Sequence, residues 1–382
     1  MRMIKKCVRN ALKVFFYIFR IFKIDNRKVL VMNFNGRGYG DNPKCIAEEL
    51  RRKNAKIVWG VLKHYEDIPS DIRQVKYQSL RWVYEMCTSK IWINNCRFPS
   101  YVRKRKGQFY IQTWHGSIGA KMVEGDANMP KEYIRKAKRD SKNADLFLSG
   151  SKFVSKLYRK AFWYDGKILE SGTPRLDAMI ANYQNGKYIS ELKKKVFDKV
   201  GIKGNPKIIM YAPTFREGND ECYDIDYRRL LSVIKQKYGG EWVVFLRFHP
   251  NIADKMKDVV TPRGVIDVTG YPDLYELLPI SDIVISDYSS TGFEAAMIKK
   301  PVFLYASDYD EYRRKERGLY FDLEDLPFPF ARNNDELMKN IKSYSDIKVK
   351  KISAELWKIF GILETGKSAE ETANMIMEVM EE

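Results

Sequence analysis

Short apolar segments alternate with amphipathic segments along most of this chain, and this alternation constrains the fold more than any other feature. A first series of apolar segments covers residues 28–34, 55–62, 91–94, 108–114 and 146–149. A second series covers residues 207–212, 242–248, 265–267, 283–286 and 301–305. Uninterrupted apolar strands separated by helices indicate parallel sheets that are covered on both faces. We therefore predict an α/β protein with two Rossmann-like domains whose parallel sheets face a central cleft.

The length of the chain agrees with two domains. Its 382 residues exceed the usual size of a single hydrophobic core. We place one Rossmann-like domain at residues 26–190 and the other at 191–382, with a charged helix at 183–200 joining them. Ligands of such sheets bind beyond the carboxyl ends of the strands. The loops that follow the apolar segments are therefore the candidate sites.

The charge of the chain points to an anionic partner. Lysine and arginine total 68 against 49 acidic residues, which gives a formal net charge of +19. Nucleic acid, a membrane surface and a phosphorylated substrate all fit such an excess. The five cysteines are scattered without metal-ligand spacing, and the sequence has neither a Walker motif nor a zinc motif. We expect no metal and no cofactor.

Residues 1–25 are predicted to form an amphipathic helix that lies on a membrane. Its apolar side chains fall within roughly 80° of Ile4 on a helical wheel, and every charged residue before Asp25 is positive. An aromatic apolar face beside a basic face is typical of helices in the lipid interface. A helix docked on protein and a signal peptide are the alternatives. The predicted membrane contacts are Lys5, Lys6, Arg9, Lys13, Phe15, Phe19 and Phe22.

Two of the three histidines directly follow apolar segments. His115 lies in the sequence Thr-Trp-His-Gly, where Gly116 permits a tight turn, and His249 lies in Arg-Phe-His-Pro. Histidine suits proton transfer because its pKa lies near neutrality. A structural histidine is the alternative for either residue alone. Their equivalent positions, one in each half, favour a catalytic role for both.

A third candidate site follows the apolar segment 283–286, where a hydroxyl-rich turn precedes a predicted helix. The free N–H groups at a helix start, together with the positive end of its dipole, favour phosphate binding. Ser289, Ser290 and Thr291 add hydroxyl donors. A plain helix cap is the alternative, but it would explain only one of these hydroxyl groups. We predict an anion site here.

Two arginines also follow strand ends. Arg216 follows the segment 207–212, and Arg247 closes the segment 242–248 beside His249. A guanidinium group can hold phosphate oxygens through two parallel hydrogen bonds. Each arginine taken alone is more often a surface charge. Together they are predicted to bind the phosphates of a substrate.

These motifs resemble those of the CDP-glycerol glycerophosphotransferases, the teichoic-acid enzymes of bacterial cell-wall biogenesis. The resemblance is carried by six blocks in consistent order, at residues 114–116, 172–177, 212–216, 247–250, 286–294 and 318–325. It implies a GT-B fold, peripheral association with the cytoplasmic face of the cell membrane, and CDP-glycerol as the donor. The acceptor it implies is a saccharide linked to undecaprenyl diphosphate. The first domain would bind this acceptor and the second CDP-glycerol.

The resemblance also implies roles for individual residues. His115 corresponds to the proposed base, which takes a proton from the acceptor hydroxyl as that oxygen attacks the β-phosphorus and CMP leaves. His249 corresponds to a second essential histidine near the donor phosphates. The hydroxyl turn would hold the diphosphate, with Asp287 supporting the loop. The predicted substrate contacts are Gly116, Arg216, Arg247, Asp287, Ser289, Ser290 and Thr291.

Two departures from the family pattern bear on how many units are added. Many members have Pro-Gly-Pro where this chain has Pro327-Phe-Pro329, and the long polymerases carry a further N-terminal domain. Both favour a short primase-type enzyme that adds one unit. A glycerol-phosphate or ribitol-phosphate polymerase, a nucleotide-sugar glycosyltransferase and a nucleic-acid-binding protein are the alternatives. A nucleic-acid-binding protein is disfavoured because the densest cluster of lysine and arginine, in residues 1–25, lies beside an aromatic face typical of lipid-binding helices. An oligomer is possible.

Overall fold

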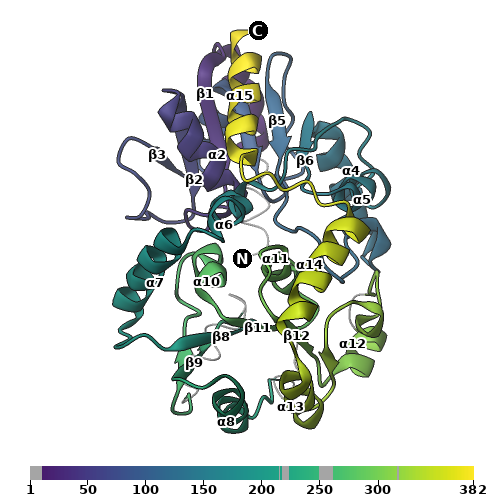
Figure 1. Ribbon diagram of the computed structural model, residues 1–382. Coiled ribbons are helices and arrows are strands. Elements are labelled where there is room, and N and C mark those ends of the chain that lie inside the picture. Colours follow the sequence, from purple (N-terminus) through teal and green to yellow (C-terminus); the bar gives the residue numbers. More distant parts are fainter. Residues whose placement is uncertain (1–10, 215, 217–222, 249–260, 316–317) are drawn as a thin grey trace. The chain divides into compact units, whose positions relative to one another are not determined.

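The computed structural model describes residues 11–214, 216, 223–248, 261–315 and 318–382, which form two compact α/β units (Figure 1). The first unit comprises Met1–His115, Met129–Asp177 and Leu363–Glu382. The second comprises Gly116–Asn128 and Ala178–Ile362. Each unit is built around its own parallel sheet.

The first unit contains a seven-stranded sheet with the order β3-β2-β1-β4-β5-β6-β7, and all its pairs are parallel. Its strands are β1 (Asp25–Met32), β2 (Lys56–Val61), β3 (Arg73–Lys76), β4 (Ser89–Asn94), β5 (Phe109–Gln112), β6 (Leu146–Leu148) and β7 (Lys167–Leu169). Its helices are α2 (Asp41–Arg52), α3 (Leu80–Thr88), α4 (Lys131–Asn143), α5 (Lys152–Lys160) and α15 (Ser368–Glu381), with short 3-10 turns η1 (Phe19–Ile21) and η3 (Pro174–Leu176).

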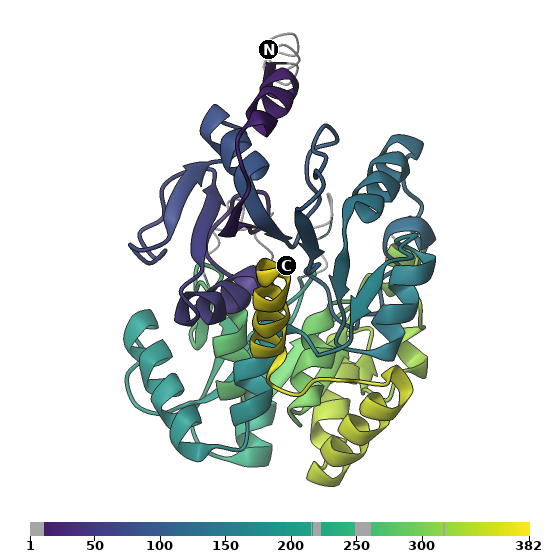
Figure 2. The same ribbon diagram turned by 90° about the horizontal axis from the view of Figure 1, so that it is seen from above.

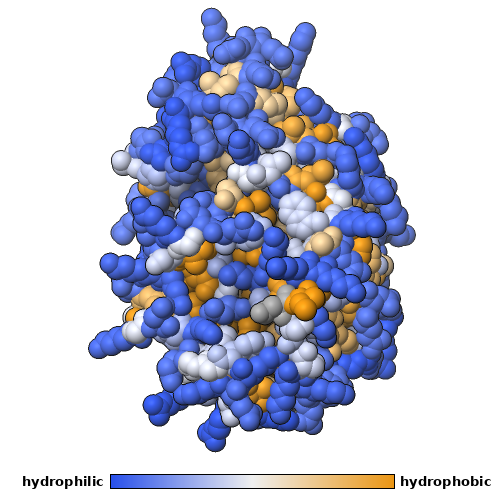
Figure 3. All heavy atoms as spheres, viewed as in Figure 1, coloured by the Kyte–Doolittle hydropathy of each residue, from blue (hydrophilic) through white to orange (hydrophobic). Residues whose placement is uncertain are grey.

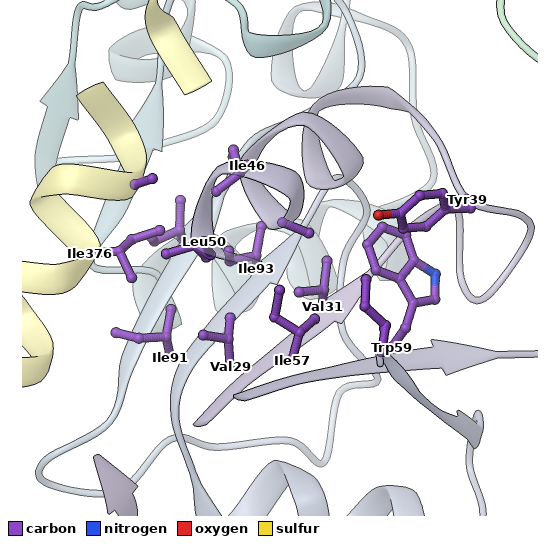
Figure 4. Packing of buried hydrophobic residues seen from close by; sticks show 14 of the residues in the cluster. Val29, Val31, Tyr39, Ile46, Leu50, Ile57, Trp59, Ile91, Ile93 and Ile376 are labelled. Atoms are coloured by element: carbon purple, nitrogen blue, oxygen red, sulfur yellow. The ribbon is translucent and has the colours of Figure 1, made fainter. Parts of the chain in front are cut away.

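The core of the first unit lies between this sheet and the helices α2 and α15 (Figure 4). Successive side chains of a strand point to opposite faces, so alternate residues of β1 and β4 share one face. That face is fully buried against isoleucine and leucine side chains of α2. Ile376 of α15 belongs to the same cluster. The last helix of the chain therefore completes the core of the first unit.

The second unit contains a six-stranded parallel sheet with the order β10-β9-β8-β11-β12-β13. Its strands are β8 (Lys207–Tyr211), β9 (Trp242–Leu246), β10 (Val265–Asp267), β11 (Ile283–Ser286), β12 (Val302–Tyr305) and β13 (Phe330–Ala331). Its helical segments include η2 (Glu124–Asp126), α6 (Asp177–Asn182), α7 (Gly186–Val200), α8 (Tyr227–Tyr238), α10 (Leu274–Ile280), α11 (Ser290–Met297), α12 (Tyr309–Lys315), η4 (Leu323–Asp325), α13 (Asn334–Ser343) and α14 (Asp346–Phe360).

Both sheets have the doubly wound strand order, which confirms the predicted α/β class with two parallel sheets. The order reverses between β1 and β4 in the first unit and between β8 and β11 in the second. Ligands of such sheets bind outside the carboxyl ends of the strands at this reversal. The loops that follow these four strands are therefore the places in each unit where a site is expected.

The units depart from the predicted domain boundaries in three places. Gly116–Asn128 and residues 178–190 belong to the second unit, and Leu363–Glu382 belongs to the first. The position of Leu363–Glu382 has a clear physical cause. The Glu364 carboxylate accepts hydrogen bonds from the backbone N–H and the hydroxyl of Thr173, and Asp177 accepts from the first N–H groups of α15. Helix α15 then packs beside α2 (Figure 2).

The predicted N-terminal helix lies partly outside the described residues, including Lys5, Lys6 and Arg9. From residue 11 to residue 18 the chain is helical, and η1 follows. Leu12 and Phe16 are buried in the first unit, where the Phe16 ring lies 6.4 Å from that of Tyr101. Phe19 packs against Tyr84 of α3. Leu12 and Phe19 belong to the predicted lipid-facing side and contact protein instead, which corrects the predicted orientation of the helix.

A different stripe of the same segment is exposed to solvent. Ile21 is 78% exposed, and its neighbours on the stripe are between 47% and 58% exposed. The stripe consists of Val14, Tyr17, Ile18 and Ile21. The spacing of three, four and seven residues places these side chains on one side of the helical segment. Phe22 is also exposed, whereas Phe15 is only half-exposed.

On the face shown in Figure 3, hydrophilic residues prevail and apolar residues occur in scattered spots. A chain in which 31% of the residues are charged is expected to present such a surface. Among the helices of the described residues, none combines the length and the apolar character needed to cross a bilayer.

Candidate functional site

His115 follows β5 in the first unit, and its imidazole ring is held in one orientation. Its Nδ1 atom lies 2.6 Å from the backbone oxygen of Asn95, and its ring stacks on Trp114 with centroids 4.2 Å apart. A carbonyl oxygen only accepts hydrogen bonds, so Nδ1 must carry the hydrogen and the lone pair of the neutral ring is on Nε2. Burial lowers the pKa of His115. The ring is therefore neutral at pH 7, as a general base requires.

The carbonyl that holds His115 is itself fixed at the strand reversal of the first sheet. Asn95 follows β4, and its side-chain oxygen accepts from the backbone N–H of Phe34, which follows β1, at 2.8 Å. The Asn95 amide nitrogen donates to the side-chain oxygen of Asn33 at 2.8 Å. Both asparagines are buried. The ends of β1 and β4 thus set the position of the atom that orients His115.

The turn before His115 needs support, because Trp114 has a φ of +54°. Residues other than glycine are uncommon in this left-handed region, and holding one there costs free energy. The side-chain oxygen of Gln112 accepts from the Trp114 N–H at 2.9 Å, and the Asn42 amide donates to the Trp114 carbonyl at 3.1 Å. Gln112 also donates to the Cys96 carbonyl at 2.9 Å. Gln112 and Asn42 thus stabilise the turn from both sides.

These amide residues were missed in the sequence analysis, which considered only groups that transfer protons or bind phosphate. The sequence could have pointed to Gln112, because it is a polar residue at the end of a strand whose other residues are apolar or aromatic. The block at residues 172–177 also contributes to this network. Buried Arg175 forms an ion pair with Asp41 at 3.2 Å, and its backbone N–H donates to the Asn42 side chain.

In the second unit, the start of α11 is partly exposed. Ser289 is the N-cap, and its hydroxyl oxygen accepts from the Thr291 N–H at 3.3 Å. Ser289 and Ser290 are half-exposed, whereas Thr291 is buried. The N-cap bond accounts for the hydroxyl group of Ser289, as the alternative of a plain helix cap predicted. The helix start still presents backbone N–H groups and two accessible hydroxyl residues, which is an arrangement suited to a phosphate group.

Asp287 joins the strand ends at the reversal of the second sheet. It follows β11, and its carboxylate accepts from the N–H and the hydroxyl of Thr214, which follows β8, at 2.7 and 2.6 Å. It also accepts from the Ser289 N–H at 3.3 Å. Because Asp287 is only 1% exposed, it supports the loop, as expected from the resemblance, and does not present a surface to a ligand.

Arg216 is buried and paired with two acidic side chains, and its predicted role as a phosphate clamp stays a prediction. Its guanidinium pairs with Asp287 at 2.9 Å and with Asp308 at 2.6 Å. It lies beside the stacked rings of Tyr288 and Tyr312, 4.7 and 5.0 Å from their centroids. The side chain is 4% exposed. The fork of donors that suits phosphate is directed here at two carboxylates.

Arg247 is half-buried and connects β9 to the loop after β10. Its Nη1 donates to the backbone oxygens of Val268 and Tyr271 at 3.2 and 2.6 Å. Burial lowers the pKa of Arg247. His249 lies outside the described residues, so its predicted approach to the donor phosphates stays a prediction, as does its pairing with His115.

The segment that follows His115 packs in the second unit, beginning at half-exposed Gly116. The Ser117 hydroxyl donates to the Glu294 carboxylate of α11 at 2.6 Å. The carbonyl of Ala120 accepts from the N–H of Tyr320 at 2.7 Å. We refer to Gly116–Asn128 as the post-histidine loop. Sequence analysis missed its connection to Glu294, whose signal is an acidic residue among the apolar residues of the segment 293–297.

Residues 14–378 match the sequence model of the CDP-Glycerol:Poly(glycerophosphate) glycerophosphotransferase family. The chain belongs to this family. The match covers both parallel sheets and includes all six blocks on which the resemblance was based. The predicted family assignment is therefore confirmed.

The chain is similar to enzymes of teichoic acid synthesis over nearly its whole length. It is 30% identical to the teichoic acid poly(glycerol phosphate) polymerase of Bacillus subtilis strain 168, over 98% of this chain and 52% of that relative. The chain thus spans about half the length of that polymerase. It is 29% identical to the teichoic acid glycerol-phosphate transferase of Staphylococcus aureus, over 98% of each chain.

A solved relative has the same architecture. The wall teichoic acid polymerase TagF superposes with a TM-score of 0.84 at 27% identity, over 100% of this chain and 96% of that chain. A TagF variant with histidine replaced by asparagine, soaked with CDPG, also superposes with a TM-score of 0.84. These comparisons agree with the two-sheet, GT-B-like fold.

Proposed function

We propose that this protein transfers glycerol phosphate from CDP-glycerol to a hydroxyl group of a disaccharide linked to undecaprenyl diphosphate, and releases CMP. The reaction would prime the linkage unit of wall teichoic acid. One observation carries the proposal: a chain of the glycerophosphotransferase family holds His115 neutral, with Nδ1 bonded to the Asn95 carbonyl. This arrangement fits the base that the transfer needs.

In the proposed mechanism, the acceptor hydroxyl gives its proton to Nε2 of His115. Its oxygen forms a bond to the β-phosphorus of CDP-glycerol, while the bond from that phosphorus to the bridging oxygen breaks and CMP leaves. Phosphoryl transfer depends mainly on positioning and on neutralising charge. The start of α11, capped by Ser289 and supported by Asp287, suits binding of the diphosphate.

Product analysis tests this function directly. The protein is incubated with CDP-glycerol and a synthetic lipid-linked disaccharide, and the products are measured by mass spectrometry. We expect one glycerol phosphate per acceptor and an equal amount of CMP. Chains of several units would make the protein a polymerase, the activity named for its Bacillus subtilis relative. Release of a nucleoside diphosphate would contradict the proposal and indicate a glycosyltransferase.

We further propose that the protein associates peripherally with the cytoplasmic face of the membrane through the exposed stripe of Val14, Tyr17, Ile18 and Ile21. Support comes from the exposure of these side chains beside Lys13 and Lys23, which are also exposed. Apolar and aromatic side chains flanked by lysines are typical of segments that bind anionic lipid. Leu12 and Phe16 would instead hold the segment on the first unit.

Replacing both Ile18 and Ile21 by serine should weaken binding to anionic phospholipid vesicles by at least roughly tenfold, because two large apolar side chains no longer enter the lipid. Co-sedimentation measures the effect. The matched control replaces Ile347 and Ile359, exposed isoleucines of α14, and should bind vesicles as the wild type does. Equal sedimentation of the Ile18/Ile21 variant and the wild type would refute this attachment site.

A further inference from the structure

The post-histidine loop passes directly in front of the start of α11. A Cβ atom added to Gly119 would lie 3.6 Å from the backbone nitrogen of Ser290. Ser117 is bonded to Glu294 in the same helix. Farther along, Lys121 forms an antiparallel bridge with Leu319. These contacts lie within the second unit and fix the course of the loop.

Lys121 is the cation that this course brings to the helix start. Its ammonium nitrogen lies 3.3 Å from the hydroxyl oxygen of Thr214. That hydroxyl donates to Asp287 at 2.6 Å, and Asp287 accepts from the Ser289 N–H. Lys121 is therefore connected to the N-cap of α11 through one hydroxyl and one carboxylate. It is half-exposed, whereas Thr214 and Asp287 are buried.

Two roles fit a lysine in this position. It would balance the charge of the buried cluster, where one arginine, Arg216, faces Asp287 and Asp308. Alternatively, it would bind an anionic ligand. The second role is favoured by the helix start, which carries partial positive charge. The buried Asp287 carboxylate already lies between Lys121 and the helix start, and the partial exposure of Lys121 leaves room for an anionic ligand to approach its ammonium group from the solvent side.

We propose that Lys121 binds the diphosphate of the nucleotide donor at the start of α11, as a substrate-binding residue that sequence reasoning did not identify. This inference rests on the proposed function for the identity of the donor. A lysine acts on phosphate as a mobile point charge. The post-histidine loop thereby contributes a residue to the donor subsite, six positions after His115.

The test compares Lys121→Met, which keeps the length of the side chain and removes its charge, with Lys121→Arg. A charge-assisted hydrogen bond is lost in the first variant, so its affinities for CDP-glycerol and for inorganic pyrophosphate should fall by roughly tenfold to a hundredfold. Cytidine, which has no phosphate, should bind equally to both proteins. Lys121→Arg should recover most of the affinity. Isothermal titration calorimetry measures the affinity for each of the three ligands.

A matched control is Lys207→Met, since Lys207 is exposed at the opposite end of β8 from the Thr214 turn. It should bind all ligands as the wild type does. Unchanged pyrophosphate affinity in Lys121→Met, or a lower melting temperature without a change in affinity, would overturn the inference and leave only a structural role. If the wild type binds pyrophosphate but not CDP-glycerol, the proposed function fails while the inference stands. If the wild type does not bind pyrophosphate, the subsite and the inference both fail.

Discussion

Replacing His115 by alanine should lower the rate of CMP release by roughly a hundredfold to ten-thousandfold, the usual contribution of a general base. Binding of CDP-glycerol should stay close to that of the wild type, because the proposed diphosphate contacts lie in the second unit. Single-turnover kinetics and calorimetry measure the two quantities separately. Lost donor binding in this variant would remove the assignment of His115 as the base.

The same assignment predicts a pH dependence. Only the neutral imidazole accepts a proton, and burial lowers the pKa of His115 below the ordinary value of 6.5. The kcat of the wild type should therefore stay level as pH falls through 6.5 and decline only under more acidic conditions. His64→Ala is the control, because His64 is exposed, and it should have the activity of the wild type. Unchanged CMP release in His115→Ala would refute the mechanism.

Replacing Arg216 by methionine should lower the free energy of unfolding by about 3–5 kcal/mol, the usual cost of removing one partner from a buried ion pair. Asp287 and Asp308 would be left buried without their cation. Lysine should not restore the loss, because it lacks the planar fork that reaches both carboxylates. Urea unfolding of the variants measures the effect.

Arg229→Met is the matched control for this prediction. Arg229 also forms an ion pair, with Asp335, but both side chains are exposed. Exposed pairs contribute less than about 1 kcal/mol, so this variant should unfold close to the wild type. If Arg216→Met is as stable as the wild type and binds CDP-glycerol weakly, this result supports the predicted role of Arg216 as a phosphate clamp.

The central strands of both sheets could be predicted from sequence because they are buried on both faces. A run of apolar residues such as 283–286 has few other interpretations, and β11 begins and ends where predicted. The strands β3, β7 and β13 were missed for the opposite reason. They are two to four residues long and include charged or half-exposed positions. These strands are defined by their pairing with a neighbouring strand, and the local sequence pattern does not reveal that pairing.

The residues of the candidate site also include some that the sequence could predict and some that it could not. His115 and Ser289 were predicted because polar residues that closely follow a buried parallel strand lie at the carboxyl end of the sheet, where ligands bind. The direction in which Arg216 points was not predictable, because its partner Asp308 is 92 residues farther along the chain. The same holds for Lys121, whose partner Thr214 is 93 residues away. Long-range pairs of this kind appear only once the fold is known.

The return of the chain to the first unit has a consequence for biosynthesis. Ile376 and its neighbours on α15 fill the core between the first sheet and α2. A ribosome synthesises these residues after every strand of the second unit. During synthesis, the first unit therefore lacks part of its core until the second sheet has all its strands.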